Sequence, residues 1–171
     1  QNFNHLKIHS QYSICEGAIK IDDLQDFSKS NKIRSLALCD TSNLCGALEF
    51  AEKISKVGTQ PIIGTQINFK YDDYIGLLPL FALNEEGYKR VIKLSSTSFL
   101  ENNELSDPHI DFKELLEDNT GVAVFSGSIF GLFGELFNKG KFGEILELYK
   151  KLKSNFGDRF YLEIQRHGDQ N

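Results

Sequence analysis

Short runs of apolar residues alternate along the chain with longer segments in which apolar residues recur every three or four positions. Runs bounded by polar or turn residues predict strands at residues 3–8, 36–39, 61–69, 77–83, 122–125 and 160–164. Helical spacing predicts helices at residues 22–31, 46–57, from 85 onward, 111–117 and 142–156, and polar residues 101–108 predict a loop.

Six short strands that alternate with helices are typical of a parallel sheet with helical crossovers. Right-handed crossovers leave two architectures, an open doubly wound sheet or a barrel. A complete (β/α) barrel usually needs about 200 residues or more. The 171 residues therefore predict one α/β domain, residues 1–171, and a barrel of this length would lack its last unit or units.

The charge and the composition narrow the classes of function. The 24 acidic and 19 basic residues give a net charge of −5, whereas a main DNA-binding surface needs an excess of Lys and Arg. There is no apolar run of about 18 residues, so no membrane span is expected. No charged-then-apolar leader is present, so no secretory signal is visible in these residues. The chain begins at Gln1 and has no Met, so we expect a piece of a longer protein.

The three cysteines have no metal-binding or redox spacing. Cys15, Cys39 and Cys45 are odd in number and contain no C-x-x-C pair. We interpret all three as small buried thiols in a reducing compartment, which favours the cytoplasm.

Functional groups of α/β folds collect where the strands end. Polar residues that follow the predicted strands are His9, Ser10, Ser13, Glu16, Asp40, Thr41, Gln66, Ser126, Ser128, Arg166 and His167. Only His9, Glu16, Asp40 and His167 among them are of a type that binds metals well. Zinc prefers His, Cys and carboxylates over hydroxyl and amide groups. The pattern therefore contains no complete set for a metal-activated water or for a nucleophile paired with a base.

Several ordered motifs resemble one family. They lie at residues 3–18, 36–46, 61–66, 84–88 and 160–165. Together they resemble the PHP (polymerase and histidinol phosphatase) domain, and more narrowly the amino-terminal domain of bacterial DNA polymerase III alpha subunits. This resemblance implies a distorted, TIM-like (β/α) barrel that is incomplete in this chain.

The resemblance also implies a context. The parent would be a DNA-directed DNA polymerase, a nucleotidyltransferase that uses Mg²⁺ in a palm region. Palm, fingers and thumb are not present in residues 1–171. The implied partners are the proofreading exonuclease subunit and the rest of the polymerase chain, and DNA would be bound mainly by the parent enzyme.

The chain departs from the family at the metal ligands. Metal-binding members have His, His, Glu, His and Cys at positions that here hold other residues: Lys7, Thr41, Gln66, Leu77 and Ser128. We therefore expect a vestigial pocket without catalytic residues, metal or cofactor, made of Lys7, His9, Glu16, Asp40, Thr41, Gln66 and Ser128. If any metal binds, His9 and Asp40 are the candidate ligands.

Lys7 changes the electrostatics of that pocket. An ammonium group repels cations, and we expect it to pair with Glu16 or Asp40 instead. As alternatives to metal ligation, His9 is expected to be hydrogen-bonded, His167 to be solvated, and Asp40 to cap the turn at residues 41–46.

Two functions are compatible with these residues. One is a non-catalytic structural module that docks the exonuclease. The other is an active metal-dependent phosphoesterase with 3′–5′ proofreading activity. The phenylalanines at positions 125, 130, 133, 137 and 142 are expected mainly in the core, with one or two lining a groove for a protein partner.

Overall fold

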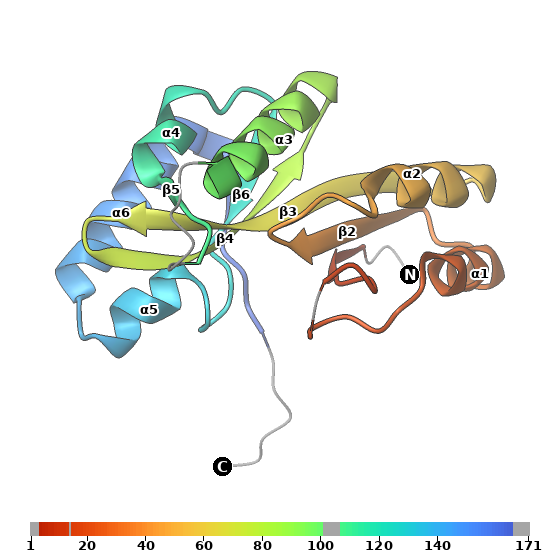
Figure 1. Cartoon of the computed structure of the whole chain (residues 1–171), viewed down its shortest axis with the longest axis horizontal. Helices are drawn as coiled ribbons and strands as arrows, with labels where there is room; N and C mark the ends of the chain where they lie inside the picture. Colours follow the sequence, from red (N-terminus) through yellow and green to blue (C-terminus); the bar gives the residue numbers. More distant parts are fainter. Residues whose placement is uncertain (1–3, 14, 101–106, 166–171) are drawn as a thin grey trace, which may run out of the picture.

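A computed structural model describes residues 4–13, 15–100 and 107–165 of this chain (Figure 1). The elements, in chain order, are β1 (His5–Ile8), α1 (Ile21–Asn31), β2 (Ser35–Thr41), α2 (Ala47–Lys56), β3 (Gln60–Tyr71), β4 (Tyr74–Ala82), α3 (Glu85–Leu100), β5 (Ile110–Asp111), α4 (Phe112–Glu117), β6 (Val122–Phe125), α5 (Leu132–Asn138), α6 (Phe142–Phe156), a 3₁₀ turn (Gly157–Arg159) and β7 (Phe160–Tyr161). No helix in the described ranges is long and apolar enough to cross a membrane.

One mixed sheet contains all seven strands, in the order β1-β2-β3-β4-β6-β7, with β5 on β3. β1, β2 and β3 are parallel, but β4 runs antiparallel to both β3 and β6. The prediction of a parallel sheet is therefore wrong for β4, whereas the pairings β1–β2, β2–β3, β3–β5 and β6–β7 are parallel. β3 and β4 are joined by Asp72 and Asp73 alone, with Asp72 at a φ of +53°, and two residues permit only a hairpin.

The sheet curls into part of a barrel. β1 and β7 end the strand order on opposite sides, yet Lys7 and Glu163, 156 residues apart, form an ion pair across the opening. Small and aromatic side chains fill the inside of the curl: Ala37, Cys39, Phe81 and Ala123. The curled α/β sheet confirms the predicted fold class, and β7 is shorter than the predicted strand at residues 160–164.

Two apolar cores lie between the sheet and its helices. The smaller core packs α1 and α2 on β2, through residues such as Leu24, Leu38 and Phe50. The larger core lies under α3 to α6 and includes Leu80, Val91 and Leu148. The sequence pattern does not predict α5, because its seven residues are too few to show a helical repeat.

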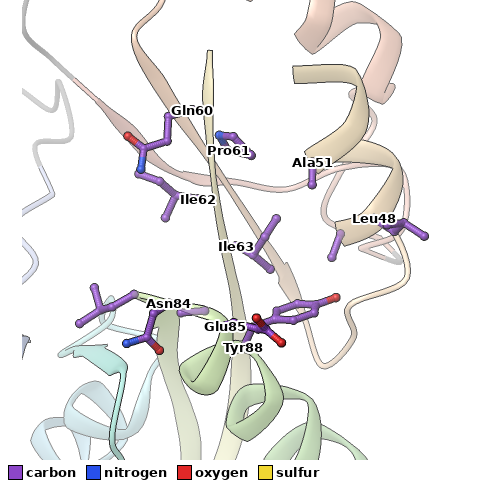
Figure 2. Close-up of a pocket in the computed structure, with 12 residues that line it drawn as sticks. Leu48, Ala51, Gln60, Pro61, Ile62, Ile63, Asn84, Glu85 and Tyr88 are labelled. Carbon is purple, nitrogen blue, oxygen red and sulfur yellow. The ribbon is translucent and has the colours of Figure 1, made fainter. Parts of the chain in front are cut away.

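β3 and β4 separate at Gly64. The last pair of their ladder is Gly64–Phe81, whereas the ladder of β4 with β6, along its other edge, continues to Ala82–Val122. The start of β3, before Gly64, lies beside α2, whereas the end of β4 leads toward α3 (Figure 1). The separation leaves a groove of about 500 Å³ between α2 and α3 (Figure 2). This groove, called the fork groove below, is lined by Ala47, Leu48, Ala51, residues 60–63, residues 82–85 and Tyr88.

Gly64 is predicted to be required where the strands separate. A β-carbon at this position would lie 2.5 Å from the Phe81 ring and 2.6 Å from the Leu80 carbonyl oxygen. Gly64→Ala should therefore lower the free energy of unfolding by about 2–3 kcal/mol, measured by urea denaturation. The matched control, Gly143→Ala in α6, meets no atom within 4 Å and should be neutral or stabilise by about 0.5 kcal/mol. Equal losses for both variants would contradict this account.

The cysteines differ from the prediction. Cys39 is buried inside the curl, but Cys15 and Cys45 are exposed. Burial raises the pKa of the Cys39 thiol far above its ordinary value, and the carboxylates of Asp40 and Glu163 add to this effect against the opposing charge of Lys7.

Thiol labelling should separate these classes. Because the thiolate is the reactive form, the folded chain should show two fast thiols toward Ellman's reagent and a third only after denaturation. The variant Cys39→Ala should lose the slow thiol and keep both fast ones. Three thiols that react at one rate in the folded protein would contradict the buried placement of Cys39.

Candidate functional site

A polar cavity of about 350 Å³ lies beside the ends of β1 and β2 and the middle of β3. Nine residues line it: Lys7, His9, Glu16, Gln66, Leu77, Ser128, Phe130, Gly131 and Gln165. Five of the seven residues expected in the vestigial pocket are among them. Of the other two, Thr41 is hydrogen-bonded to Glu16 and Gln66 of the lining, whereas Asp40 is connected to it only through Ser13, whose hydroxyl lies 3.4 Å from His9 Nδ1. His167 lies outside the described residues.

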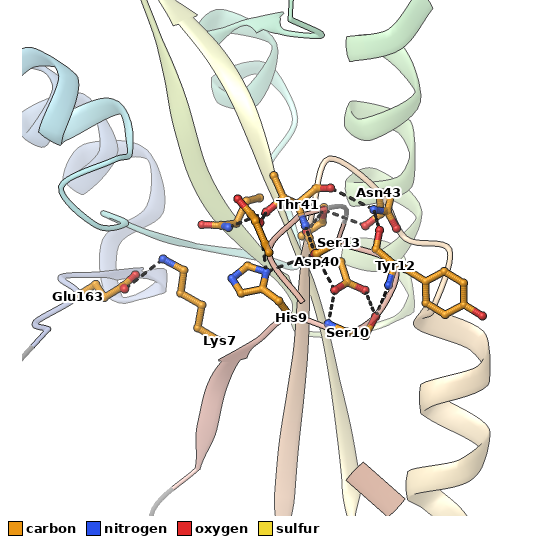
Figure 3. A network of polar contacts seen from close by, with 12 residues as sticks. Lys7, His9, Ser10, Tyr12, Ser13, Asp40, Thr41, Asn43 and Glu163 are labelled. Carbon is orange, nitrogen blue, oxygen red and sulfur yellow. Dashed lines mark hydrogen bonds and ion pairs between the residues drawn. The ribbon is translucent and has the colours of Figure 1, made fainter. Parts of the chain in front are cut away.

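Asp40 is the centre of a buried hydrogen-bond network (Figure 3). Its side chain is 1% exposed and accepts hydrogen bonds from the Ser10 amide (2.6 Å), the Ser10 hydroxyl (2.7 Å) and the Ser13 hydroxyl (2.9 Å). Both carboxylate oxygens are thus occupied. Asp40 holds the segment after β1, and neither of the roles expected from the sequence, a cap of the turn at 41–46 or a partner of Lys7, is observed.

A second chain of polar contacts crosses the cavity from His9 to Gln66. His9 Nδ1 lies 3.7 Å from Glu16 Oε2 and 3.4 Å from the Ser13 hydroxyl oxygen. The Thr41 hydroxyl donates to Glu16 Oε2 at 2.5 Å and accepts from Gln66 Nε2 at 3.0 Å. His9 is therefore a hydrogen-bonded histidine, and Thr41 links two side chains through its single hydroxyl.

Lys7 pairs with Glu163, which corrects the expected partner. Lys7 Nζ lies 3.2 Å from Glu163 Oε1, and the side chains are 24% and 14% exposed. The Glu163 amide donates to the Ser126 hydroxyl at 2.9 Å, which fixes this segment beside β6. Sequence reasoning missed Glu163, because nothing local relates β1 to a residue 156 positions later.

The pocket residues do not fit a metal cluster. Four of the five positions where the family resemblance implies ligands, Lys7, Gln66, Leu77 and Ser128, line the cavity without offering a strong metal ligand. No group of three or more His, Cys, Asp or Glu side chains in the described residues is arranged to hold a metal. Asp40, one of the two candidate ligands, already uses both oxygens.

The phenylalanines lie further out than expected. Phe125 and Phe133 are partly buried, whereas Phe130, Phe137 and Phe142 are exposed, and Phe137 meets Phe142 edge to face at 5.7 Å. A core role for most of the five is thus wrong. Phe130 lines the polar cavity, and Phe133 and Phe137 line a separate apolar hollow beside α5.

Comparison with known proteins decides the family. The family described as "PHP domain" matches residues 5–167. The chain belongs to the PHP domain family. The PHP chain is also 39% identical over 166 residues to "DNA polymerase III subunit alpha" of Rickettsia felis, covering 96% of this chain and 14% of that protein.

Other relatives carry the same name. The PHP chain is 36% identical to the Caulobacter vibrioides protein and 32% identical to that of Vibrio cholerae, covering 98% and 97% of this chain and 15% of each relative. The chain therefore spans about a seventh of the length of these relatives.

Two solved structures are similar to the PHP chain. An amidohydrolase from Chromobacterium violaceum has a TM-score of 0.45 at 17% identity, over 56% of this chain and 32% of its own. A putative metal-dependent phosphoesterase from Bifidobacterium adolescentis has a TM-score of 0.44 at 12% identity, over 92% of this chain and 57% of its own.

The Asp40 network is predicted to be structural. Asp40→Asn places an amide donor against groups that already donate, and should lower the free energy of unfolding by about 3 kcal/mol at neutral pH. The control Glu16→Gln, at an exposed side chain, should cost less than about 1 kcal/mol. Urea denaturation of both variants measures this difference, and a larger loss for Glu16→Gln would disprove the assignment.

Proposed function

We propose that this chain is the PHP portion of a DNA polymerase III alpha subunit and that it is a non-catalytic scaffold. The relatives support the polymerase context, since those at 32–39% identity match 96% or more of this chain and share that name. The chemistry of the pocket supports the absence of hydrolysis.

The observation that carries the proposal is the Lys7–Glu163 ion pair. Lys7 stands where metal-binding relatives have a histidine, and a divalent cation about 4 Å from an ammonium group would be repelled by several kcal/mol at a partly exposed site. The ion pair also joins β1 to the segment after β7. It therefore connects the two ends of the curled sheet, which in the described part of the chain are not paired to each other through strand hydrogen bonds.

The scaffold role gives the chain specific partners. We propose that it stabilises the remainder of the polymerase chain and docks the proofreading exonuclease subunit in the cytoplasm. Its net charge of −5 does not favour phosphate contacts, so DNA would be held by other regions of the parent enzyme. Mg²⁺ would serve nucleotidyl transfer in the palm, outside these residues.

Metal content is the direct test. After incubation with Zn²⁺ or Mn²⁺ and exhaustive dialysis, the chain should retain far less than one equivalent of metal and should not hydrolyse bis(p-nitrophenyl) phosphate. A variant that restores the ligands of the family, Lys7→His with Thr41→His, Gln66→Glu, Leu77→His and Ser128→Cys, is the positive control and should retain metal.

The opposite result would favour the phosphoesterase. Several retained metal ions per wild-type chain, together with phosphodiester hydrolysis that is lost in His9→Ala, would replace the scaffold proposal by the enzymatic one. Metal without hydrolysis would contradict only the claim that the pocket excludes cations.

A further inference from the structure

The fork groove lies on a part of the sheet that the helix layer leaves uncovered. α1 connects β1 to β2 and α2 connects β2 to β3, but the hairpin between β3 and β4 supplies no helix. Within the described residues, α2 and α3 therefore flank the start of β3 without a helix between them. The groove of about 500 Å³ occupies that place.

The walls of the groove are mainly apolar. Ile63 of β3 points toward Tyr88 of α3 (Figure 2), and Leu48 and Ala51 of α2 line the groove on its other side. Leu48 is 69% exposed and Leu83, at the other side, is 55% exposed. Large apolar side chains gathered at one concave place are typical of a protein-binding surface rather than of scattered surface residues.

Charge is present at one point of the groove. Glu85 is the only charged residue among those that line it in the described part of the chain. Its side chain is 81% exposed and pairs with Lys89 one helical turn away at 2.8 Å, an exposed contact that contributes little to stability. A basic group on a bound partner can therefore share or replace Lys89 as the partner of Glu85.

The strand bordering the groove is unsuited to a second strand. The Gln60 amide donates to the Arg34 carbonyl on the side of β2. Because backbone groups alternate sides along a strand, those of Pro61 face the groove, and proline has no N–H to donate. An extended segment would lose a ladder hydrogen bond there, whereas a helix satisfies its backbone internally.

We propose that the fork groove binds one amphipathic helix of a partner protein. The helix would place an apolar stripe between α2 and α3 and a Lys or Arg beside Glu85. The proposal rests on the scaffold role, for which it provides a specific docking place. It does not depend on the polar pocket beside Gln66, so the metal measurements test that role separately.

The experiment uses a displayed library of helical peptides of about five turns, with positions on one face and its flanks randomised. The library is selected on the wild-type chain after depletion on Leu48→Glu, a substitution at an exposed side chain. The best peptide is then made synthetically, labelled with fluorescein and titrated by anisotropy with each variant.

We expect enriched peptides with apolar residues at helical spacing and a flanking Lys or Arg. Leu48→Glu or Ala51→Arg should weaken the synthetic peptide by about tenfold or more, and Glu85→Gln by a smaller factor. Leu146→Glu, at a 52% exposed position on α6, is the matched control and should leave binding unchanged. Circular dichroism checks that each variant is folded.

Three outcomes would overturn the proposal. Failure of every selected peptide to discriminate wild type from Leu48→Glu would show that the groove binds no such helix. Enriched peptides rich in proline or without basic residues would assign a different ligand class. A wild-type dimer in sedimentation that Leu48→Glu converts to a monomer would identify a second copy of this chain as the occupant.

Discussion

Asp72 and Asp73 leave β3 and β4 only two residues in which to reverse direction, and an antiparallel hairpin is the connection that this length permits. The mixed sheet follows from that constraint, because the hairpin sets β4 antiparallel to β3, and β4 is also antiparallel to β6 on its other side. The uncovered strip of β3 follows too, because a hairpin brings no crossover helix with it.

The same long strand connects the two functional regions. The start of β3 borders the fork groove through Pro61 and Ile63, and Gln66, further along, lies in the polar pocket. Gly64 lies between them at the point where β4 departs. A single strand thus connects a surface and a pocket of different chemistry, the first apolar with one carboxylate and the second mainly polar.

Local patterns predict the helices better than the sheet. The predicted helix at residues 142–156 coincides with α6, and those at 22–31 and 46–57 lie within one residue of α1 and α2 at each end, because each has a clear apolar stripe. The direction of β4 is missed, since the two aspartates of the turn carry no apolar signal and fall within the gap between predicted strands. Exposure of Cys15 and Cys45 depends on loop packing, which residue type alone does not determine.

The pocket is predictable as a group but not as a set of contacts. The ends of parallel strands meet, so Lys7, His9 and Gln66 can be placed together from order alone. Which carboxylate meets Lys7 depends on how far the sheet curls, and that is a property of the whole strand order. The pairing of Glu163 with Lys7 therefore cannot be predicted from the sequence, although the segment around Glu163 carries part of the family resemblance.

The contacts in the pocket also explain why one substitution is insufficient to restore a metal site. Replacing Lys7 alone leaves Glu163 partly buried without its cation, which is costly. Replacing Thr41 alone removes the hydroxyl that joins Glu16 to Gln66. Each change disturbs a contact that another pocket residue depends on, so their effects on stability are coupled rather than additive. A metal-binding arrangement and the present one are thus two self-consistent sets of side chains, and the intermediates between them lack the advantages of either.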